Sequence, residues 1–162
     1  NAASGCTASF SRVTGAAPEG TGAVRVIVTA ASGNGGDIEL SQYGRHLESN
    51  TTFEVVFWAR ADRERSISAG TRKGSPNWDD YGLDATVPVG TNWTEQTVRF
   101  AANATVTNSR LQFLVGSTVG TVWLDNIRLR TAGPDVYRRE FDNGLVLLNG
   151  TWEERAVDVG HG

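Results

Sequence analysis

The chain has 162 residues, with 15 Lys and Arg against 18 Asp and Glu, and a formal net charge of −3 at pH 7. Recognition of nucleic acid needs a dense basic patch that neutralises phosphates, whereas the basic residues here are spread thinly among the acids. No apolar run approaches the ~20 residues that span a bilayer, so we expect neither a nucleic-acid partner nor a membrane partner.

Short runs rich in Val, Thr, Phe and Ile alternate with clusters of Gly, Asn and Ser along most of the chain. Helical periodicity is nearly absent, and many short strands separated by turn residues are typical of an all-β sandwich or barrel. We predict strands over residues 7–14, 23–30, 37–43, 51–61, 65–73, 93–102, 110–117 and 121–130.

Two of these strands indicate which side chains face a core, because successive residues of a strand point to opposite faces. The residues that we expect to pack between two sheets are Phe53, Val55, Phe57, Ala59, Leu111, Phe113 and Val115. The residues that we expect to face outward are Glu54, Val56, Trp58, Arg60, Arg110, Gln112 and Leu114. An outward face that mixes Trp, Arg, Gln and Glu suits a groove for a polar ligand with apolar faces.

The composition changes after residue 132. The run "VYRREFDNGLVLLNG" (136–150) places two apolar segments around Asn143-Gly144, which is a strong hairpin signal, and a further strand is predicted over 154–160. We therefore divide the chain into a β-sandwich, residues 1–132, and a C-terminal β extension, residues 133–162. The extension either packs on the sandwich or opens another domain.

Signatures of catalysis are scarce. Neither His46 nor His161 has a metal-binding spacing, and the chain lacks a nucleophile elbow, a phosphate-binding glycine loop and a cysteine–histidine signature. A glycosidase needs two carboxyl groups on opposite sides of the bond that it cleaves, which a sequence alone leaves open. The acids that could supply half of such a pair are Glu39, Glu54, Asp79, Asp80, Asp84 and Glu95. Binding accounts for the same residues better, so we expect no catalysis in this chain.

The stretch "RKGSPNWDDYGLD" (72–84) holds the strongest candidate for ligand contact. Trp78 stands among Gly, Ser, Pro, Asn and Asp, so its ring is either a loop anchor folded into a core or a platform for a ligand. Sugars have flat C–H faces and rims of hydroxyls. An indole ring offers an apolar plane for the face, and carboxylate, amide and guanidinium groups can hold the hydroxyls. Asp80 and Tyr81 follow Trp78 at once and are candidates for the same site.

Other aromatic and basic residues are less distinctive. Trp58 and Arg60 lie on an outward strand face, where they either contact a ligand or simply pack and meet solvent. Trp93 and Trp123 stand at a strand start and within a strand, and we expect them to pack in the core or at an edge.

Five stretches together resemble the carbohydrate-binding modules of families 4, 9 and 22. They are "FEVVFWARAD", "NWDDYGLD", "NWTEQTVRF", "RLQFLVGS" and "GTVWLDNIRLR". The resemblance covers roughly residues 10–130. It implies a jelly-roll β-sandwich attached to a secreted glycoside hydrolase, since such modules accompany mainly xylanases and glucanases. The run "REFDNGLVLLN" after the module looks like the opening of an accessory β-domain found beside some glycosidase catalytic barrels.

The resemblance also implies positions for the sugar-binding groove. In similar modules a groove aromatic stands a few residues before an acid-Tyr-Gly, an acid follows the first Gly-rich loop, and an arginine begins the next-to-last strand. The matching residues are Trp78 with Asp80-Tyr81-Gly82, Glu39 of "GGDIEL", and Arg110 with Gln112 on the same face. Similar modules carry a second groove aromatic where this chain has Gly35-Gly36, and either Tyr43 or Trp58 could replace it.

Modules of this kind often hold a structural calcium ion away from the groove. The resemblance implies that Glu19 of "APEGTG" and Asp125 of "WLDN" supply its side-chain ligands. Calcium takes 6–8 oxygens, so backbone carbonyls would complete the set. The usual first strand, which carries another calcium ligand, has no counterpart before "NAASGC". The alternative is that Asp125 bonds a loop and Glu19 is solvated.

We therefore expect a non-catalytic, secreted bacterial module that binds polysaccharide or oligosaccharide of the β-glucan or xylan class. Trp78 would stack on the sugar, while Glu39, Arg110 and Gln112 orient its hydroxyls. The module would keep an attached glycoside hydrolase near its substrate. The alternative, favoured by Gly35-Gly36, is a structural spacer of the same fold without affinity for sugar.

Overall fold

The structure, a computed structural model, describes residues 5–15, 17–74, 76–133, 136–150, 154, 156 and 157. Contacts divide the chain into two compact units, Asn1–Thr131 and Ala132–Gly162. Within the described residues, no helix has the length and apolar character that crossing a membrane would need.

The first unit contains nearly all of the regular structure. Its elements are β1 (Thr7–Thr14), β2 (Gly22–Ala30), the 3-10 helix η1 (Gly35–Asp37), β3 (Glu39–Leu47), β4 (Thr52–Ala61), β5 (Arg65–Arg72), β6 (Asp80–Val89), β7 (Thr94–Ala101), β8 (Val106–Leu114) and β9 (Gly120–Thr131). The second unit holds a hairpin of β10 (Val136–Phe141) and β11 (Gly144–Asn149).

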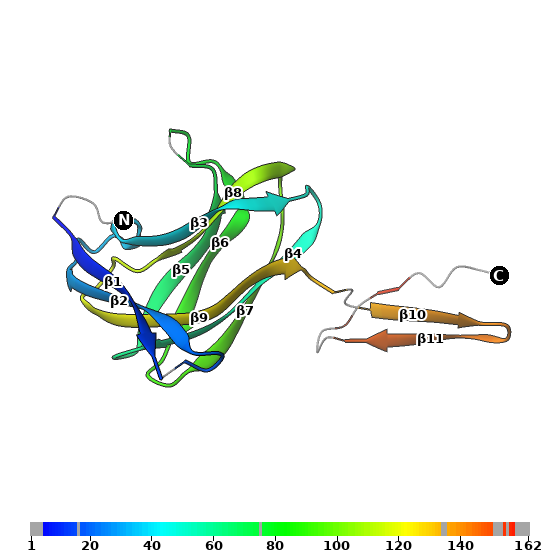
Figure 1. Cartoon of the computed structure of the whole chain (residues 1–162). Coiled ribbons are helices and arrows are strands. Elements are labelled where there is room, and N and C mark those ends of the chain that lie inside the picture. The colour runs from blue at the N-terminus through cyan, green and yellow to red at the C-terminus, as the bar shows by residue number, and fades with distance from the viewer. Residues whose placement is uncertain are drawn as a thin grey trace. The chain divides into compact units, whose positions relative to one another are not determined.

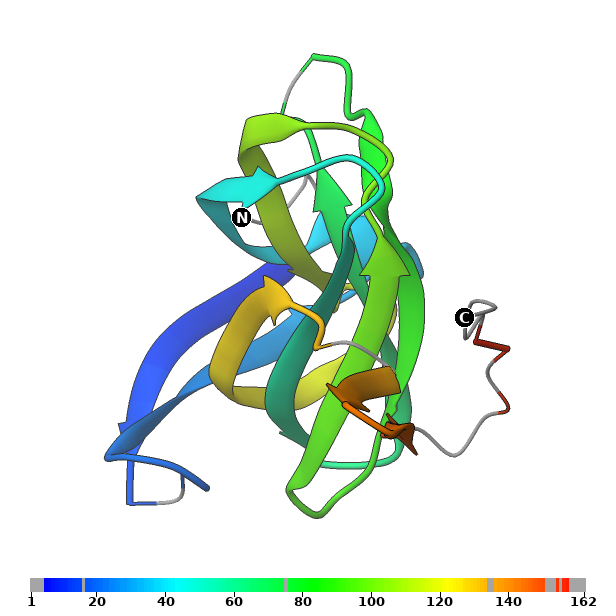
Figure 2. The same cartoon turned by 90° about the vertical axis from the view of Figure 1, so that its right-hand side faces the viewer.

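The strands of the first unit form two antiparallel sheets that face each other (Figure 1, Figure 2). One sheet has five strands in the order β1-β2-β9-β4-β7, and the other has four strands in the order β3-β8-β5-β6. Strands that follow one another in sequence are often in different sheets, which is the connectivity of a jelly roll. The predicted all-β jelly-roll sandwich and its C-terminal hairpin are confirmed.

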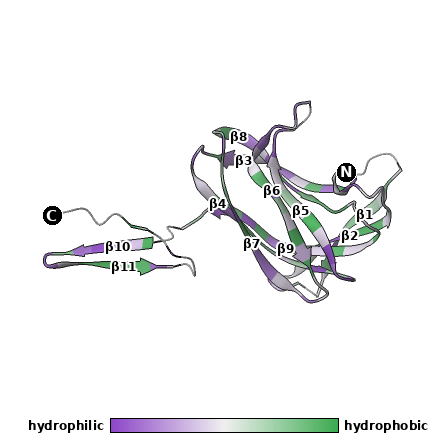
Figure 3. Ribbon diagram, turned by 180° about the vertical axis from the view of Figure 1, so that it is seen from behind, coloured by the Kyte–Doolittle hydropathy of each residue, from purple (hydrophilic) through white to green (hydrophobic). Residues whose placement is uncertain are grey.

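The core lies between the two sheets, where the period-2 alternation of each strand directs its apolar residues (Figure 3). All seven residues predicted to face inward on the strands at 51–61 and 110–117 are buried. Phe57 and Phe113 come from opposite sheets and meet edge to face, with ring centroids 4.8 Å apart. Such a pair stabilises the sandwich beyond its apolar burial, by about 0.5–1.5 kcal/mol.

One strand is absent from the prediction, and two others are displaced. β6 was not predicted because Asp80, Gly82, Asp84 and Pro88 give its sequence a low β-propensity. β6 is an edge strand and Pro88 is exposed on it, which is where a sheet tolerates a residue without an N–H. β3 runs on to Leu47, whereas 37–43 was predicted; β8 covers Val106–Leu114, whereas 110–117 was predicted.

The C-terminal hairpin forms where it was predicted, with one change of register. Phe141 pairs with Gly144, so the two-residue turn is Asp142-Asn143 rather than Asn143-Gly144. The strand predicted over 154–160 is not found at the described residues 154, 156 and 157, and its other positions lie outside the described residues.

β6 approaches the connection between β7 and β8 at Gly82. Gly82 has a φ of 110°, and a Cβ built there would lie 2.2 Å from the carbonyl oxygen of Ala101. Only glycine fits, because this φ strains other residues and the obstructing atom belongs to the backbone. The carbonyl of Tyr81 accepts a hydrogen bond from the Asn103 N–H at 3.4 Å, so this close approach also positions Tyr81.

Replacing Gly82 with alanine is expected to lower the free energy of unfolding by at least about 2 kcal/mol, since a strained φ alone costs about 1–3 kcal/mol. Urea denaturation followed by circular dichroism measures the change. Gly90→Ala is the matched control, because a Cβ at Gly90 would meet nothing within 4 Å. Equal midpoints for Gly82→Ala and wild type would contradict this account of the contact.

Candidate functional site

The outward face of the four-stranded sheet brings several predicted site residues together across β3, β8 and β5. The register places Gln112 between Ser41 of β3 and Gly70 of β5, and it places Arg110 beside Arg72. Residues paired in this way point to the same face, so the side chains of Arg110 and Gln112 lie side by side on the outer surface of β8.

A buried polar network forms the floor of this face. Arg110 Nη1 lies 3.1 Å from Glu39 Oε1, and Arg110 Nη2 donates to Gln112 Oε1 at 2.7 Å. Arg110 is only 4% exposed and Gln112 only 3%, although both face outward from the sheet. Burial of a guanidinium is costly unless charge and hydrogen bonds compensate for it, and Glu39 supplies both.

Trp78 covers this network from the loop between β5 and β6, which projects beyond the ends of the strands (Figure 1, Figure 2). The loop is closed by a hydrogen bond from the Lys73 N–H to the Asp79 carbonyl, 2.8 Å long. Trp78 has a φ of 56°, a left-handed conformation that is unfavourable for a bulky residue. Its ring centroid lies 4.6 Å from Arg110 Cζ, while 47% of the residue remains exposed. The indole therefore has one face on a cation and a large surface open to solvent.

Tyr43 extends the aromatic surface from β3. Its ring centroid is 5.7 Å from Arg110 Cζ, and the residue is 51% exposed. A Cβ built on Gly74 would lie 3.2 Å from the Tyr43 hydroxyl oxygen, so the ring also lies against the loop that carries Trp78. Tyr43 of β3 and Trp78 of the β5–β6 loop therefore both lie near the Arg110 guanidinium.

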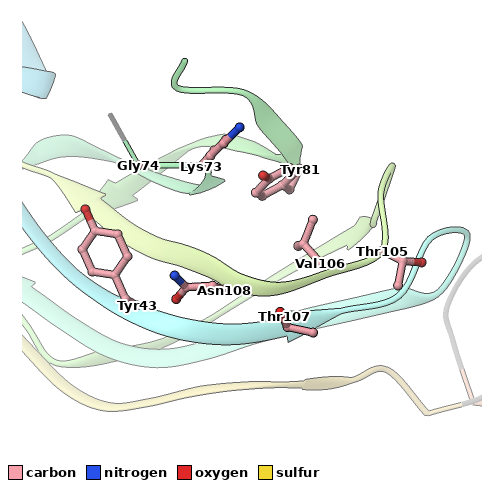
Figure 4. Close-up of a pocket in the computed structure, with 8 residues that line it drawn as sticks. All are labelled: Tyr43, Lys73, Gly74, Tyr81, Thr105, Val106, Thr107 and Asn108. Atoms are coloured by element: carbon pink, nitrogen blue, oxygen red, sulfur yellow. The ribbon is translucent and has the colours of Figure 1, made fainter. Parts of the chain in front are cut away.

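A hollow of about 650 Å³ adjoins this cluster and shares Tyr43 with it (Figure 4). Tyr43 and Tyr81 come from strands on either side of it, and the start of β8 lies between them. The remaining lining residues are Lys73, Gly74, Thr105, Val106, Thr107 and Asn108. The hollow therefore combines two aromatic rings with amide, hydroxyl and ammonium groups.

The structure places Asp80 and Tyr81 next to this cluster. Asp80 Oδ1 accepts the Gly82 N–H at 2.6 Å, and its Oδ2 lies 3.9 Å from Arg72. Asp80 is thus engaged in holding the start of β6. Tyr81 packs partly against the core and presents the rest of its side chain to the hollow.

Trp58 and Arg60 lie elsewhere, on the outer face of the five-stranded sheet. Arg60 Cζ lies 4.2 Å from the ring centroid of Trp123 and 5.3 Å from that of Trp93. Trp58 and Arg60 are therefore not part of the cluster around Trp78. Trp93 and Trp123 pack on an outer face rather than inside the core, with Arg60 between them.

The sequence alone did not clearly identify three residues of this site, which are Tyr43, Lys73 and Asn108. Tyr43 was considered as one of two replacements for a missing aromatic, and the structure brings it, and not Trp58, to Arg110. The signal was available in the alternation of Glu39, Ser41 and Tyr43, which share one face of β3. Asn108 lies in the part of β8 that precedes the predicted strand, where its Oδ1 accepts the Gly44 N–H at 2.9 Å.

The two predicted metal ligands, Glu19 and Asp125, are neighbours in space. The Glu19 N–H donates to Asp125 Oδ2 at 3.1 Å, and the Asn126 N–H donates to Asp125 Oδ1 at 2.8 Å. Asp125 is 9% exposed and Glu19 is exposed. No group of three or more His, Cys, Asp and Glu gathers anywhere among the described residues. Both Asp125 oxygens therefore accept backbone N–H groups and Glu19 is exposed, as in the alternative in which Asp125 bonds a loop and Glu19 is solvated. A cation would use the remaining lone pairs of Asp125 together with backbone carbonyls and water.

The model of a family described as "Carbohydrate binding domain" matches residues 3–120. No curated protein matches the sequence. The fold is similar to a structure described as "CBM4 structure and function", with a TM-score of 0.68 and 18% identity over 79% of each chain.

Two further solved structures are similar in fold. One is endo-1,4-beta-D-xylanase 10B of Clostridium thermocellum, comprising CBM22-1 and GH10 modules with xylohexaose, at a TM-score of 0.60 and 15% identity; the match covers 76% of this chain and 24% of that one. The other is the second N-terminal cellulose-binding domain of Cellulomonas fimi beta-1,4-glucanase C, at a TM-score of 0.61 and 16% identity over 77% of this chain and 86% of that one.

Removing the buried guanidinium should destabilise the sandwich. For Arg110→Met we expect a loss of about 3 kcal/mol in the free energy of unfolding, because Glu39 and Gln112 lose a buried partner. Chemical denaturation measures the loss, and Arg12→Gln, at an exposed arginine of β1, should change it by less than about 0.5 kcal/mol. Equal stability of Arg110→Met and wild type would show that the network contributes nothing to the fold.

Proposed function

The chain belongs to the carbohydrate-binding domain family whose model spans residues 3–120, and we propose that it is a non-catalytic module that binds a neutral polysaccharide at Trp78. The glycan would be of the β-glucan or xylan class. In this proposal a sugar ring stacks on Trp78, the chain continues past Tyr43, and the hollow bounded by Tyr81 accommodates a neighbouring unit.

The exposed ring of Trp78 is the observation that carries the proposal. A loop anchor would bury its ring, whereas Trp78 is 47% exposed. It also has a left-handed φ, which costs about 1–3 kcal/mol and persists only where the surroundings hold it. The Arg110 guanidinium below fixes the inner face of the indole by a cation–π contact, so the ring presents a fixed apolar plane at its outer face.

Polar contacts with the glycan divide into two groups in this proposal. The rim of the hollow supplies Lys73, Thr107 and Asn108, which can bond hydroxyls without rearrangement. Glu39, Arg110 and Gln112 were expected to orient hydroxyls, and in the observed conformation they are covered and bonded to one another. We assign them first to holding Trp78, and they would reach a sugar only if the ring moved aside.

The proposal extends to the setting of the module. The similar xylanase chain joins a CBM22-1 module to a GH10 module. By analogy, this domain would be extracellular and would hold an attached glycoside hydrolase near its polysaccharide. The binding free energy would then raise the local concentration of substrate for the enzyme, as tethering does for any second binding event.

The alternative function is a spacer of the same fold without affinity for sugar. The network around Arg110 favours this alternative, because Glu39 Oε1 and Gln112 Oε1, which could otherwise bind a sugar hydroxyl, already bind Arg110. It is also favoured by Gly35 and Gly36, which occupy η1 where similar modules carry a second aromatic.

Trp78→Ala distinguishes the two functions. Affinity electrophoresis against xylan, mixed-linkage glucan, and galactose- or mannose-based chains should show retardation of wild type by at least one neutral glycan. The variant should bind that glycan roughly 5- to 30-fold more weakly, which corresponds to about 1–2 kcal/mol of lost apolar contact. Trp78→Phe, which keeps a smaller plane, should recover part of the affinity.

Phe10→Ala is the matched control, since Phe10 is an exposed aromatic on β1 of the other sheet. It should leave retardation unchanged. Absence of retardation by every glycan, with the fold intact by circular dichroism, would rule out the binding function and favour the spacer. Retardation that Trp78→Ala leaves unchanged would place the sugar site elsewhere.

We also propose that Glu19 and Asp125 hold a structural calcium ion together with backbone oxygens. Their adjacency supports this, because the Glu19 N–H reaches Asp125 across 106 positions of sequence and ties the β1–β2 connection to β9. A cation there would link the same two segments. It would play no part in the contact with sugar.

Thermal unfolding with calcium and with a chelator checks the calcium site. Millimolar calcium should raise the melting temperature of wild type, since ligand present at about 100 times its Kd adds about 2.7 kcal/mol. Glu19→Gln, at an exposed position, should reduce that rise while leaving the chelated protein unchanged. Identical melting curves for wild type in calcium and in chelator would remove calcium from the account.

A further inference from the structure

The outer face of the five-stranded sheet carries a concentration of arginine and tryptophan that the sugar site does not use. We call it the arginine–tryptophan face, and its residues are Arg25, Glu54, Trp58, Arg60, Trp93, Glu95, Arg99, Trp123, Arg128 and Arg130. Five arginines oppose two glutamates and the buried Asp125, a net charge of +2, whereas the whole chain has a net charge of −3. Positive charge is therefore gathered on one face of an acidic protein.

One row across the face sets Arg60 against two indole rings. Arg25 is the register partner of Trp123, which is in turn the partner of Arg60. Arg60 Cζ lies 4.2 Å from the ring centroid of Trp123 and 5.3 Å from that of Trp93. Stacking fixes the plane of a guanidinium and leaves its N–H groups at the edge of the stack, ready to donate to an anion.

A second part of the face holds three partly exposed arginines. Glu54 accepts from Arg130 at 2.7 Å and from Arg99 at 3.2 Å, so two guanidiniums share one buried carboxylate. The side chains of Arg99 and Arg130 are 44% and 57% exposed. Arg128, which is 39% exposed, lies 2.8 Å from Glu95. Arg128 and Arg130 therefore present part of their guanidinium groups to solvent.

Donors outnumber acceptors on this face. Each arginine offers five N–H groups, and the acceptors nearby are few. Among the described residues, Trp58 Nε1, Arg60 Nε and Arg128 Nε are buried atoms without a hydrogen-bond partner. The arginine stems also cover Val56, which faces outward yet is only 4% exposed. These buried atoms lie out of reach of an external ligand, so an anion would have to bind the exposed ends of the arginine side chains.

We propose that the arginine–tryptophan face is a second binding surface, and that its ligand is a carboxylated polysaccharide such as a uronic-acid chain. Carboxylates along the chain would bind the solvent-exposed guanidinium groups, and the partly exposed tryptophan edges would contact the sugar rings. The flat outer surface of a sheet suits an extended chain. This surface lies on the sheet opposite to Trp78, so the proposal stands independently of the sugar site.

The observations favour a glycan over an acidic protein as the occupant. Trp and Arg are enriched in protein interfaces as well, but the centre of such an interface is also more apolar than the rest of the surface. Among the described residues, none of the exposed large hydrophobic residues belongs to this face. Its tryptophans are half-buried between arginines, which leaves a charged surface with narrow apolar strips.

The test uses affinity electrophoresis in gels that contain polygalacturonate at low ionic strength. The test variant is Arg25→Gln/Arg99→Gln/Arg128→Gln, which leaves Arg130 paired with the buried Glu54. The matched control is Arg12→Gln/Arg63→Gln/Arg138→Gln, which removes the same charge from positions outside the face. Wild type and control should be retarded, and added salt should weaken the retardation. The test variant should bind at least about tenfold more weakly.

Three results would overturn the proposal. The first is that polygalacturonate does not retard wild type, and the second is that the two triple variants lose affinity for it equally. The third is that polyglutamate competes for binding as effectively as oligogalacturonate does. Trp78→Ala should bind polygalacturonate as strongly as wild type does. The test variant should bind any neutral glycan as strongly as wild type does. The failure of one site can therefore be told apart from the failure of the other. If the test variant does not fold, Arg25→Gln/Arg128→Gln replaces it, with Arg12→Gln/Arg63→Gln as control.

Discussion

The ion pair between Arg110 and Glu39 is the interaction on which the candidate site depends. A guanidinium that is 4% exposed requires a carboxylate and further acceptors, and Glu39 of β3 and Gln112 of β8 provide them to its two Nη atoms. Its Nε is buried and has no hydrogen-bond partner among the described residues. The same guanidinium makes a cation–π contact with Trp78, so a buried charge holds the exposed ring in position. The aromatic platform and the stability of the four-stranded sheet are therefore coupled through one side chain.

The loop that carries Trp78 depends on the sheet in a second way. Its two ends are joined by a backbone hydrogen bond from Lys73 to Asp79, and Gly74, next to Lys73, lies against Tyr43. The strands that flank it are held by register pairs and by the close approach of Gly82 to Ala101. Rigid strands thus position a loop with an unfavourable backbone conformation, which is the usual division between scaffold and site.

The sequence predicted the sandwich better than it predicted the site. Alternation in the strand around Phe57 distinguishes inward from outward residues, because burial acts on one face of a strand at a time. Alternation does not say which of two sheets a strand joins, so Trp58 and Arg60 were grouped with Trp78 although they lie on the other sheet. The burial of Arg110 was also not predictable from its strand, because the ring that covers it comes from a loop 32 positions away. β6 was missed because an edge strand accepts residues that a central strand excludes.

The back-to-back arrangement of the two sheets has a consequence for the material around the protein. Outward faces of a sandwich point in opposite directions, and the core keeps them at a fixed separation of about 10 Å between sheets. A ligand on one face leaves the other accessible. A module that binds a neutral polysaccharide on one sheet and an acidic polysaccharide on the other would cross-link two polymers of a composite wall. It would stay bound to that wall longer than either contact alone would allow.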